Sequence, residues 1–156
     1  MAAPSQLLRL DKAQRCYLHQ LGLSDSEAFT KFNFAPPSIR RAIGMLGFLH
    51  KRILGLCHPC LRDLLPVAVG LDADYHSKAL DPFSGEVIFQ RRLYERSLYA
   101  YILMYNRLPQ ATVDLPTVSA FQAQLTHLAK NRVTLDPENW RSSFQSLADV
   151  VRMLYG

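Results

Sequence analysis

The stretch RSLYAYILMYNRLP, residues 96–109, holds the signals that decide the fold. It begins as an aromatic helix and stops at Asn-x-Leu-Pro, because a proline ring cannot continue a helix. A short polar loop follows, and Pro116 introduces a second segment with helical spacing of apolar residues. The stretch therefore predicts two helices separated by a tight connection.

The same periodicity extends outward over most of the chain. Apolar residues recur every three or four positions, and Gly, Pro, Ser and Asp separate the segments. We expect helices at residues 6–21, from Ser24, at 39–56, 60–65, 87–106, 117–132 and from Asp136 onward. No segment is convincing as a strand. The prediction is an all-α fold, with six to seven helices packed around one core as an irregular bundle. Residues 1–156 would form a single domain with an irregular loop at about 67–86.

Individual residues sharpen this expectation. Gly22 should end the first helix, Ser24 and Glu27 form a capping box, and Ser38 can cap the helix that follows Pro36-Pro37. Gly44 and Gly47 are best explained by close packing against another helix. His50 lies on an apolar helix face, where a core histidine bonded to a backbone carbonyl is expected. The predicted core includes Trp140, Phe121, Leu46 and Leu98.

The composition is that of a globular protein with basic character. The chain has 156 residues, 49% of them hydrophobic and 20% charged, and a formal net charge of +5. Such a charge favours polyanionic partners, nucleic acid first. No apolar run reaches the roughly 18 residues of a membrane span. Three cysteines without an export signal indicate reduced thiols and an intracellular location, with a mitochondrial one as the alternative.

Two motifs could carry metal or redox chemistry. Cys57 and Cys60 have the spacing of a redox dithiol or half a zinc site, but a second ligand pair is missing, and chance placement at a helix end is the simpler interpretation. Asp72 and Asp74 could bind a divalent ion, or form part of a solvated loop. No nucleophile stands at a recognisable spacing from a base, so we expect no catalytic residues, no metal and no cofactor.

Basic residues on two of the predicted helices are the remaining candidate site. Arginine pairs with phosphates, and aromatic faces stack on unpaired bases. On helix 39–56, Arg40 and Lys51 lie on one flank of the apolar face. Arg41 and Arg52 lie on the other flank. The candidate nucleic-acid contacts are Arg40, Arg41, Lys51, Arg52, Arg91, Arg92 and Arg96. The alternative is a solvated, salt-bridged helix face.

Three segments carry a resemblance to a known family. They are Leu10-x-x-x-Gln14, RRAIGMLG at residues 40–47, and Tyr105-Asn106-x-Leu108-Pro109 with the apolar residues that follow it. Together they resemble the C-terminal region of the reverse-transcriptase polyproteins of non-LTR (LINE-like) retroelements. The family's Trp is Tyr105 here, and its Lys after the phenylalanine is Gln122. The catalytic palm has no counterpart, so the resemblance implies a post-catalytic fragment without polymerase activity.

Two classes of function follow. The first is a nucleic-acid-binding helical module that resembles this retroelement region. The second is a structural or accessory subunit of a larger assembly, organellar or ribonucleoprotein, held by its helical surfaces. Neither class requires a small-molecule substrate.

Overall fold

The computed structural model describes residues 4–60, 67–68, 78–79, 98–144, 150 and 154, and most of these residues are helical. Six α-helices lie within these residues: α1 (Pro4–Gln20), α2 (Asp25–Phe32), α3 (Pro37–Ile53), α6 (Leu98–Asn106), α7 (Gln110–Val113) and α8 (Val118–Leu135). A 3-10 turn, η1 (Trp140–Ser142), follows α8. The all-α prediction with six to seven helices is confirmed.

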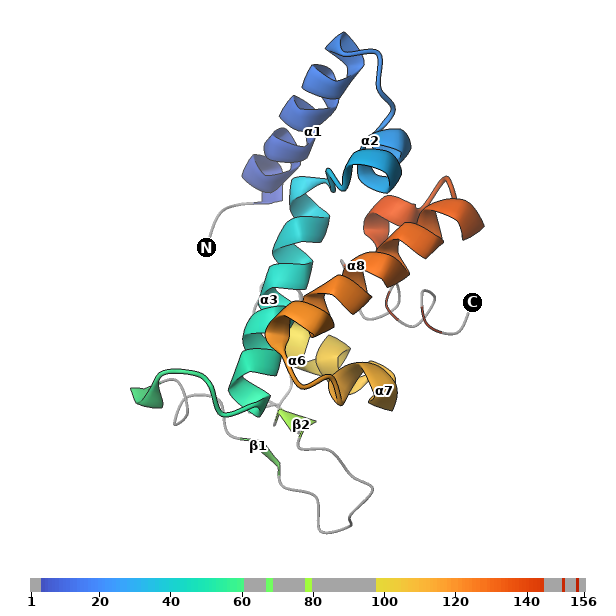
Figure 1. The fold of residues 1–156 in the computed structure, drawn as a ribbon. Helices are drawn as coiled ribbons and strands as arrows, with labels where there is room; N and C mark the ends of the chain where they lie inside the picture. Colours follow the sequence, from blue (N-terminus) through green and yellow to red (C-terminus); the bar gives the residue numbers. More distant parts are fainter. Residues whose placement is uncertain are drawn as a thin grey trace.

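The helices are arranged around α3 (Figure 1). α8 crosses α3, and α6 packs against α3 as well, while α1 meets α3 near the beginning of α3. The only strands among the described residues are β1 (Val67–Ala68) and β2 (Lys78–Ala79). They pair antiparallel, with Val67 opposite Ala79. Residues 61–65 and 87–97 of the predicted helices, most of the loop at 67–86, and residues 145–149 and 151–153 of the predicted last helix lie outside the described residues. No described helix has the length and hydropathy that crossing a bilayer requires.

The core lies where α3, α6 and α8 meet. Phe121, Leu46 and Trp140 are buried, as predicted, and Leu98 is half-buried at the edge of the core. Trp140 connects distant segments, because its ring stacks on Phe29 of α2 with centroids 5.7 Å apart. The core also contains side chains of all three central helices: Ile39, Leu49, Ile102, Met104, Tyr105 and Leu125.

Side-chain caps begin several of the helices. Ser24 accepts a hydrogen bond from the Glu27 backbone N–H at 3.1 Å, which confirms Ser24 as the cap of α2. The Glu27 carboxylate does not close the predicted capping box but pairs with Lys31 at 2.6 Å. The prediction that Ser38 caps α3 is wrong. Pro36 occupies that position, and the Asp11 carboxylate of α1 accepts from the Ser38 backbone N–H at 3.0 Å. The cap thus fastens α1 to α3.

Two predicted helix boundaries are wrong. The helix expected to reach residue 56 ends at Ile53, because Gly55 adopts a left-handed conformation with φ +73° that reverses the chain. The helix expected from Asp136 does not begin there: η1 follows instead, and Phe144 has φ +64°, whereas Val150 and Leu154 are helical. A positive φ at Phe144 cannot continue a helix. It turns the chain so that both Trp140 and Phe144 are buried.

The two glycines of α3 differ in their surroundings. A Cβ atom at Gly47 would lie 2.4 Å from Nε2 of Gln122 on α8, so close helix packing explains this glycine, as predicted. A Cβ atom at Gly44 would meet nothing within 4 Å. The prediction of close packing is therefore wrong for Gly44, which lies on an exposed part of α3.

This difference predicts that alanine stabilises the folded chain more at position 44 than at position 47. Gly44→Ala should raise the free energy of unfolding by about 1 kcal/mol, the difference in helix propensity. Gly47→Ala should raise it less or lower it, because Gln122 must move aside. Urea denaturation of the two variants measures both effects. An equal gain at both positions would contradict the close approach of α8 at Gly47.

Candidate nucleic-acid interface

The structure places four of the seven predicted nucleic-acid contacts on α3. Arg40 and Arg41 are exposed near its beginning, and Lys51 is exposed near its end, beside the half-buried Arg52. Arg91, Arg92 and Arg96 lie outside the described residues. Lys51 is eleven positions after Arg40, which corresponds to about 16 Å along a helix. The four residues therefore form two basic groups rather than one cluster.

The Arg40 guanidinium is held in place by neutral groups. It donates a hydrogen bond to Oε1 of Gln14 on α1 at 3.1 Å, and Gln14 donates in turn to the Ala35 carbonyl at 3.2 Å. The guanidinium carbon lies 5.4 Å from the centroid of the Phe34 ring, within cation–π range. The side chain is thus oriented without a carboxylate that would neutralise it.

Arg41 lies on the other flank of α3, close to Tyr101 of α6. Burial raises the pKa of the Tyr101 hydroxyl, while the guanidinium of Arg41 acts in the opposite direction through its charge and a side-chain hydrogen bond. This contact again involves a neutral group, and no described carboxylate pairs with Arg41.

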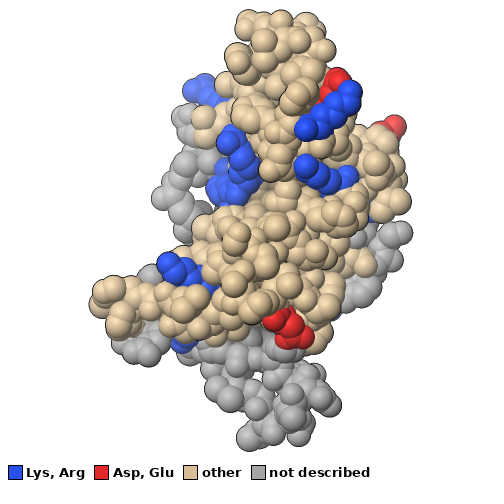
Figure 2. Space-filling model, in the orientation of Figure 1, with Lys and Arg blue, Asp and Glu red and all other residues tan. Residues whose placement is uncertain are grey.

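The acidic residues of the described chain are largely engaged elsewhere. Asp25 pairs with Arg15 at 3.6 Å and with Arg141, and Asp136 pairs with Arg132 at 2.9 Å. Glu27 pairs with Lys31, and Asp11 accepts a hydrogen bond from the backbone at the beginning of α3. None of the ion pairs between described residues involves Arg40, Arg41 or Lys51. In the view of Figure 2, Lys and Arg side chains form several groups on the surface, and few acidic side chains are visible.

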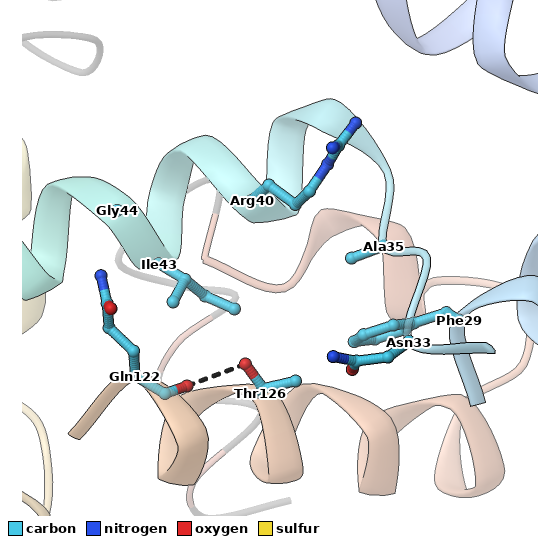
Figure 3. A pocket seen from close by; sticks show the side chains of 8 residues that line it. All are labelled: Phe29, Asn33, Ala35, Arg40, Ile43, Gly44, Gln122 and Thr126. Atoms are coloured by element: carbon cyan, nitrogen blue, oxygen red, sulfur yellow. Dashed lines mark hydrogen bonds between the residues drawn. The ribbon is translucent and has the colours of Figure 1, made fainter. Parts of the chain in front are cut away.

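A hollow of about 280 Å³ adjoins Arg40. It lies between the end of α2, the first half of α3 and the middle of α8 (Figure 3). Buried apolar residues, Phe29, Ala35 and Ile43, form its floor. The sequence did not indicate this hollow, because its walls come from segments about 90 residues apart. Nor did it indicate that Gln14 orients Arg40.

His50 is the core residue that the sequence predicted. Its Nε2 lies 2.8 Å from the Leu115 carbonyl oxygen, and its Nδ1 lies 2.9 Å from the Tyr105 hydroxyl. Burial lowers the pKa of His50, and the hydrogen bond to Leu115 acts in the opposite direction. Both ring nitrogens of His50 have a hydrogen-bond partner, which explains why this polar side chain can be buried in the core.

The candidate metal ligands are not brought together within the described chain. Cys57 is half-buried and Cys60 exposed, and both are free thiols. No group of three or more His, Cys, Asp or Glu side chains suited to a metal ion occurs among the described residues. Asp72 and Asp74 lie outside the described residues.

Comparison with known proteins assigns no relative to the chain. No protein-family model, curated protein or solved structure matches it.

Proposed function

We propose that this chain is a non-catalytic helical module that binds nucleic acid through its basic helix faces. The observation that supports this most directly is the state of Arg40, Arg41 and Lys51. All three are exposed, and none forms an ion pair with a described acidic residue. The proposed role agrees with the resemblance to the C-terminal region of non-LTR retroelement reverse transcriptases, which implies a part without the polymerase centre.

Binding would be mainly electrostatic. Each phosphate neutralised by a Lys or Arg releases counterions, so affinity falls as salt rises. The guanidinium of Arg40 is oriented in advance by Gln14 and Phe34, which reduces the entropy lost when it contacts a phosphate. Phosphate contacts carry no sequence information directly, so affinity should be largely independent of sequence.

The salt dependence of RNA and DNA binding tests this proposal. Arg40→Gln should reduce the slope of log affinity against log salt by about 0.9 on duplex DNA, or about 0.7 on a single strand. Arg91, Arg92 and Arg96, replaced together by Gln, should reduce it by roughly three times as much. Arg107→Gln is the control, because it removes one exposed charge outside α3 and outside the candidate set. An unchanged slope in the triple variant would assign those arginines to a solvated helix face.

A second candidate function, an accessory subunit of a larger assembly, has its own support. Several large apolar side chains of α1 are exposed, including Leu8 at 67%, Leu10 at 55% and Tyr17 at 56%. Apolar residues gathered on one helix are typical of surfaces that another protein covers. Absence of any salt-dependent binding to nucleic acid, together with self-association or instability of the isolated chain, would favour this function over the first.

A further inference from the structure

The hollow beside Arg40 is an open depression with enough volume for a small ligand. Its volume of about 280 Å³ is near the lower end of such sites, roughly 300 Å³. Figure 3 shows Ile43 projecting from α3 toward α8, and Gln122 extending from α8 toward α3. Gly44 has no side chain to fill the opening, and a Cβ atom there would meet nothing within 4 Å. The space therefore stays open between two helices that are packed closely one turn further on, at Gly47.

Two amide side chains at this hollow have unused hydrogen-bonding capacity. Neither Asn33 nor Gln122 makes a side-chain hydrogen bond with another described residue, and the Asn33 amide points toward the open space (Figure 3). The bond drawn there joins the Thr126 hydroxyl to the Gln122 backbone carbonyl, at 2.8 Å, and leaves the Gln122 amide unused. Each amide can both donate and accept, so a ligand with a planar edge of donors and acceptors would satisfy them.

The charged residue at the hollow indicates a negatively charged group on the ligand. Arg40 is the only ionisable residue among those that line it. Its guanidinium is fixed by Gln14 and Phe34, and no described carboxylate pairs with it. Figure 3 shows the Arg40 side chain directed away from α8, so its guanidinium lies at the rim of the hollow and not inside it. At the rim it can reach a phosphate, to which a guanidinium can donate two parallel hydrogen bonds.

From these observations we propose that the hollow takes up one unpaired nucleotide of the bound nucleic acid. Arg40 contacts the phosphate, and Asn33 and Gln122 bond the edge of the base over the apolar floor. This inference rests on the proposed function and adds to it that the bound nucleic acid is single-stranded at the site. A base within a duplex is stacked and paired, and unstacking and unpairing it costs a few kcal/mol. The site therefore selects single strands, which the phosphate contacts alone would not do.

The experiment compares a short single-stranded RNA with a hairpin duplex of equal charge, using fluorescence anisotropy at one salt concentration. The native chain should bind the single strand at least tenfold more tightly. Gly44→Leu fills the hollow at an exposed helical position where a side chain has room, and should abolish this preference. Gln122→Ala removes one amide and should weaken it. Ala123→Leu, which adds the same bulk on α8 at an exposed position that does not line the hollow, should leave the preference intact.

The outcomes separate this inference from the proposed function. Equal binding of the single strand and the duplex, with the salt slope retained, overturns the nucleotide site and leaves electrostatic binding standing. A preference that persists in Gly44→Leu, with an unchanged melting temperature, also overturns it. No binding of either RNA overturns both. Adenosine monophosphate provides the last arm: competition at micromolar concentration would identify a free nucleotide as the ligand instead of a strand.

Discussion

Phe121→Ala should lower the free energy of unfolding by about 3–5 kcal/mol, the usual cost of truncating a buried phenylalanine. The Phe121 side chain is fully buried on α8. Its ring stacks on that of His50 with centroids 4.1 Å apart and an interplanar angle of 8°, and it lies 5.7 Å from the Tyr105 ring. Removing it would leave a cavity where α3, α6 and α8 meet, with a polar imidazole on its wall.

Chemical denaturation followed by circular dichroism measures this loss. Leu135→Ala is the matched control, because Leu135 belongs to the same helix and is 72% exposed. It should change stability by less than about 0.5 kcal/mol. A denaturation midpoint that is the same in Phe121→Ala and the native chain would show that α8 does not dock on α3 in solution.

The helices and much of the core could be predicted because their signals are local. On α3, the residues expected on the apolar face include Ile39, Leu46 and His50, and all three are fully buried. On α8, Phe121 and Leu125 are likewise buried at the expected spacing. Helical spacing determines which residues share a face, and when most of a helix is surrounded, that face becomes the core.

The first helix shows where this reasoning stops. The spacing of Leu10, Leu18 and Leu21 is as helical as that of α3, yet only Leu18 is buried. Periodicity does not tell which part of an apolar stripe another helix covers. The first helix is instead attached by polar contacts: Asp11 binds the backbone of Ser38, and Gln14 binds the Ala35 carbonyl. These pairs join residues more than 20 positions apart, and no local pattern predicts them.

For the candidate interface too, the sequence predicted some features and missed others. The prediction that charged side chains beside an apolar face point outward is confirmed for Arg40, Arg41 and Lys51. What orients them, and the hollow between α3 and α8, depend on tertiary packing. Gln122 shows this most clearly: from the sequence it is only a position where a lysine is missing, whereas in the structure its amide lies over Gly47 and lines the hollow. Binding of nucleic acid by these groups stays a prediction.

The contacts of His50 determine which nitrogen of the neutral imidazole carries the hydrogen. A carbonyl oxygen only accepts, so the 2.8 Å contact with Leu115 requires a hydrogen on Nε2. In the neutral imidazole, Nδ1 then has no hydrogen, and the Tyr105 hydroxyl, 2.9 Å away, donates to it. Burial also lowers the pKa of His50, and burial together with the charge of Asp114 raises the pKa of Tyr105. Both groups are therefore neutral near pH 7. Protonation of Nδ1 would deprive the Tyr105 hydroxyl hydrogen of its acceptor.

This state makes stability fall on mild acidification. In the unfolded chain His50 should titrate near its usual value of about 6.5, whereas in the folded chain its pKa is lower. Below about pH 6.5 the unfolded state binds a proton that the folded state does not, so its free energy falls relative to the folded state. One such proton lowers the free energy of unfolding by up to about 1.4 kcal/mol per pH unit. The contribution is fully present above the unfolded value and is lost as the pH falls toward the folded one.

Urea denaturation at intervals between pH 7.5 and 5.5 measures this dependence. His50→Gln should flatten it, because glutamine can still donate to the Leu115 carbonyl but does not titrate. The variant should also be less stable at pH 7.5, since the stacking of the imidazole on Phe121 is lost. His19→Gln is the control: His19 is exposed on α1, and its replacement should leave the pH dependence of the native chain unchanged. If His50→Gln loses stability with acid as steeply as the native chain, His50 does not supply the linked proton, and the inference that burial keeps this histidine neutral is wrong.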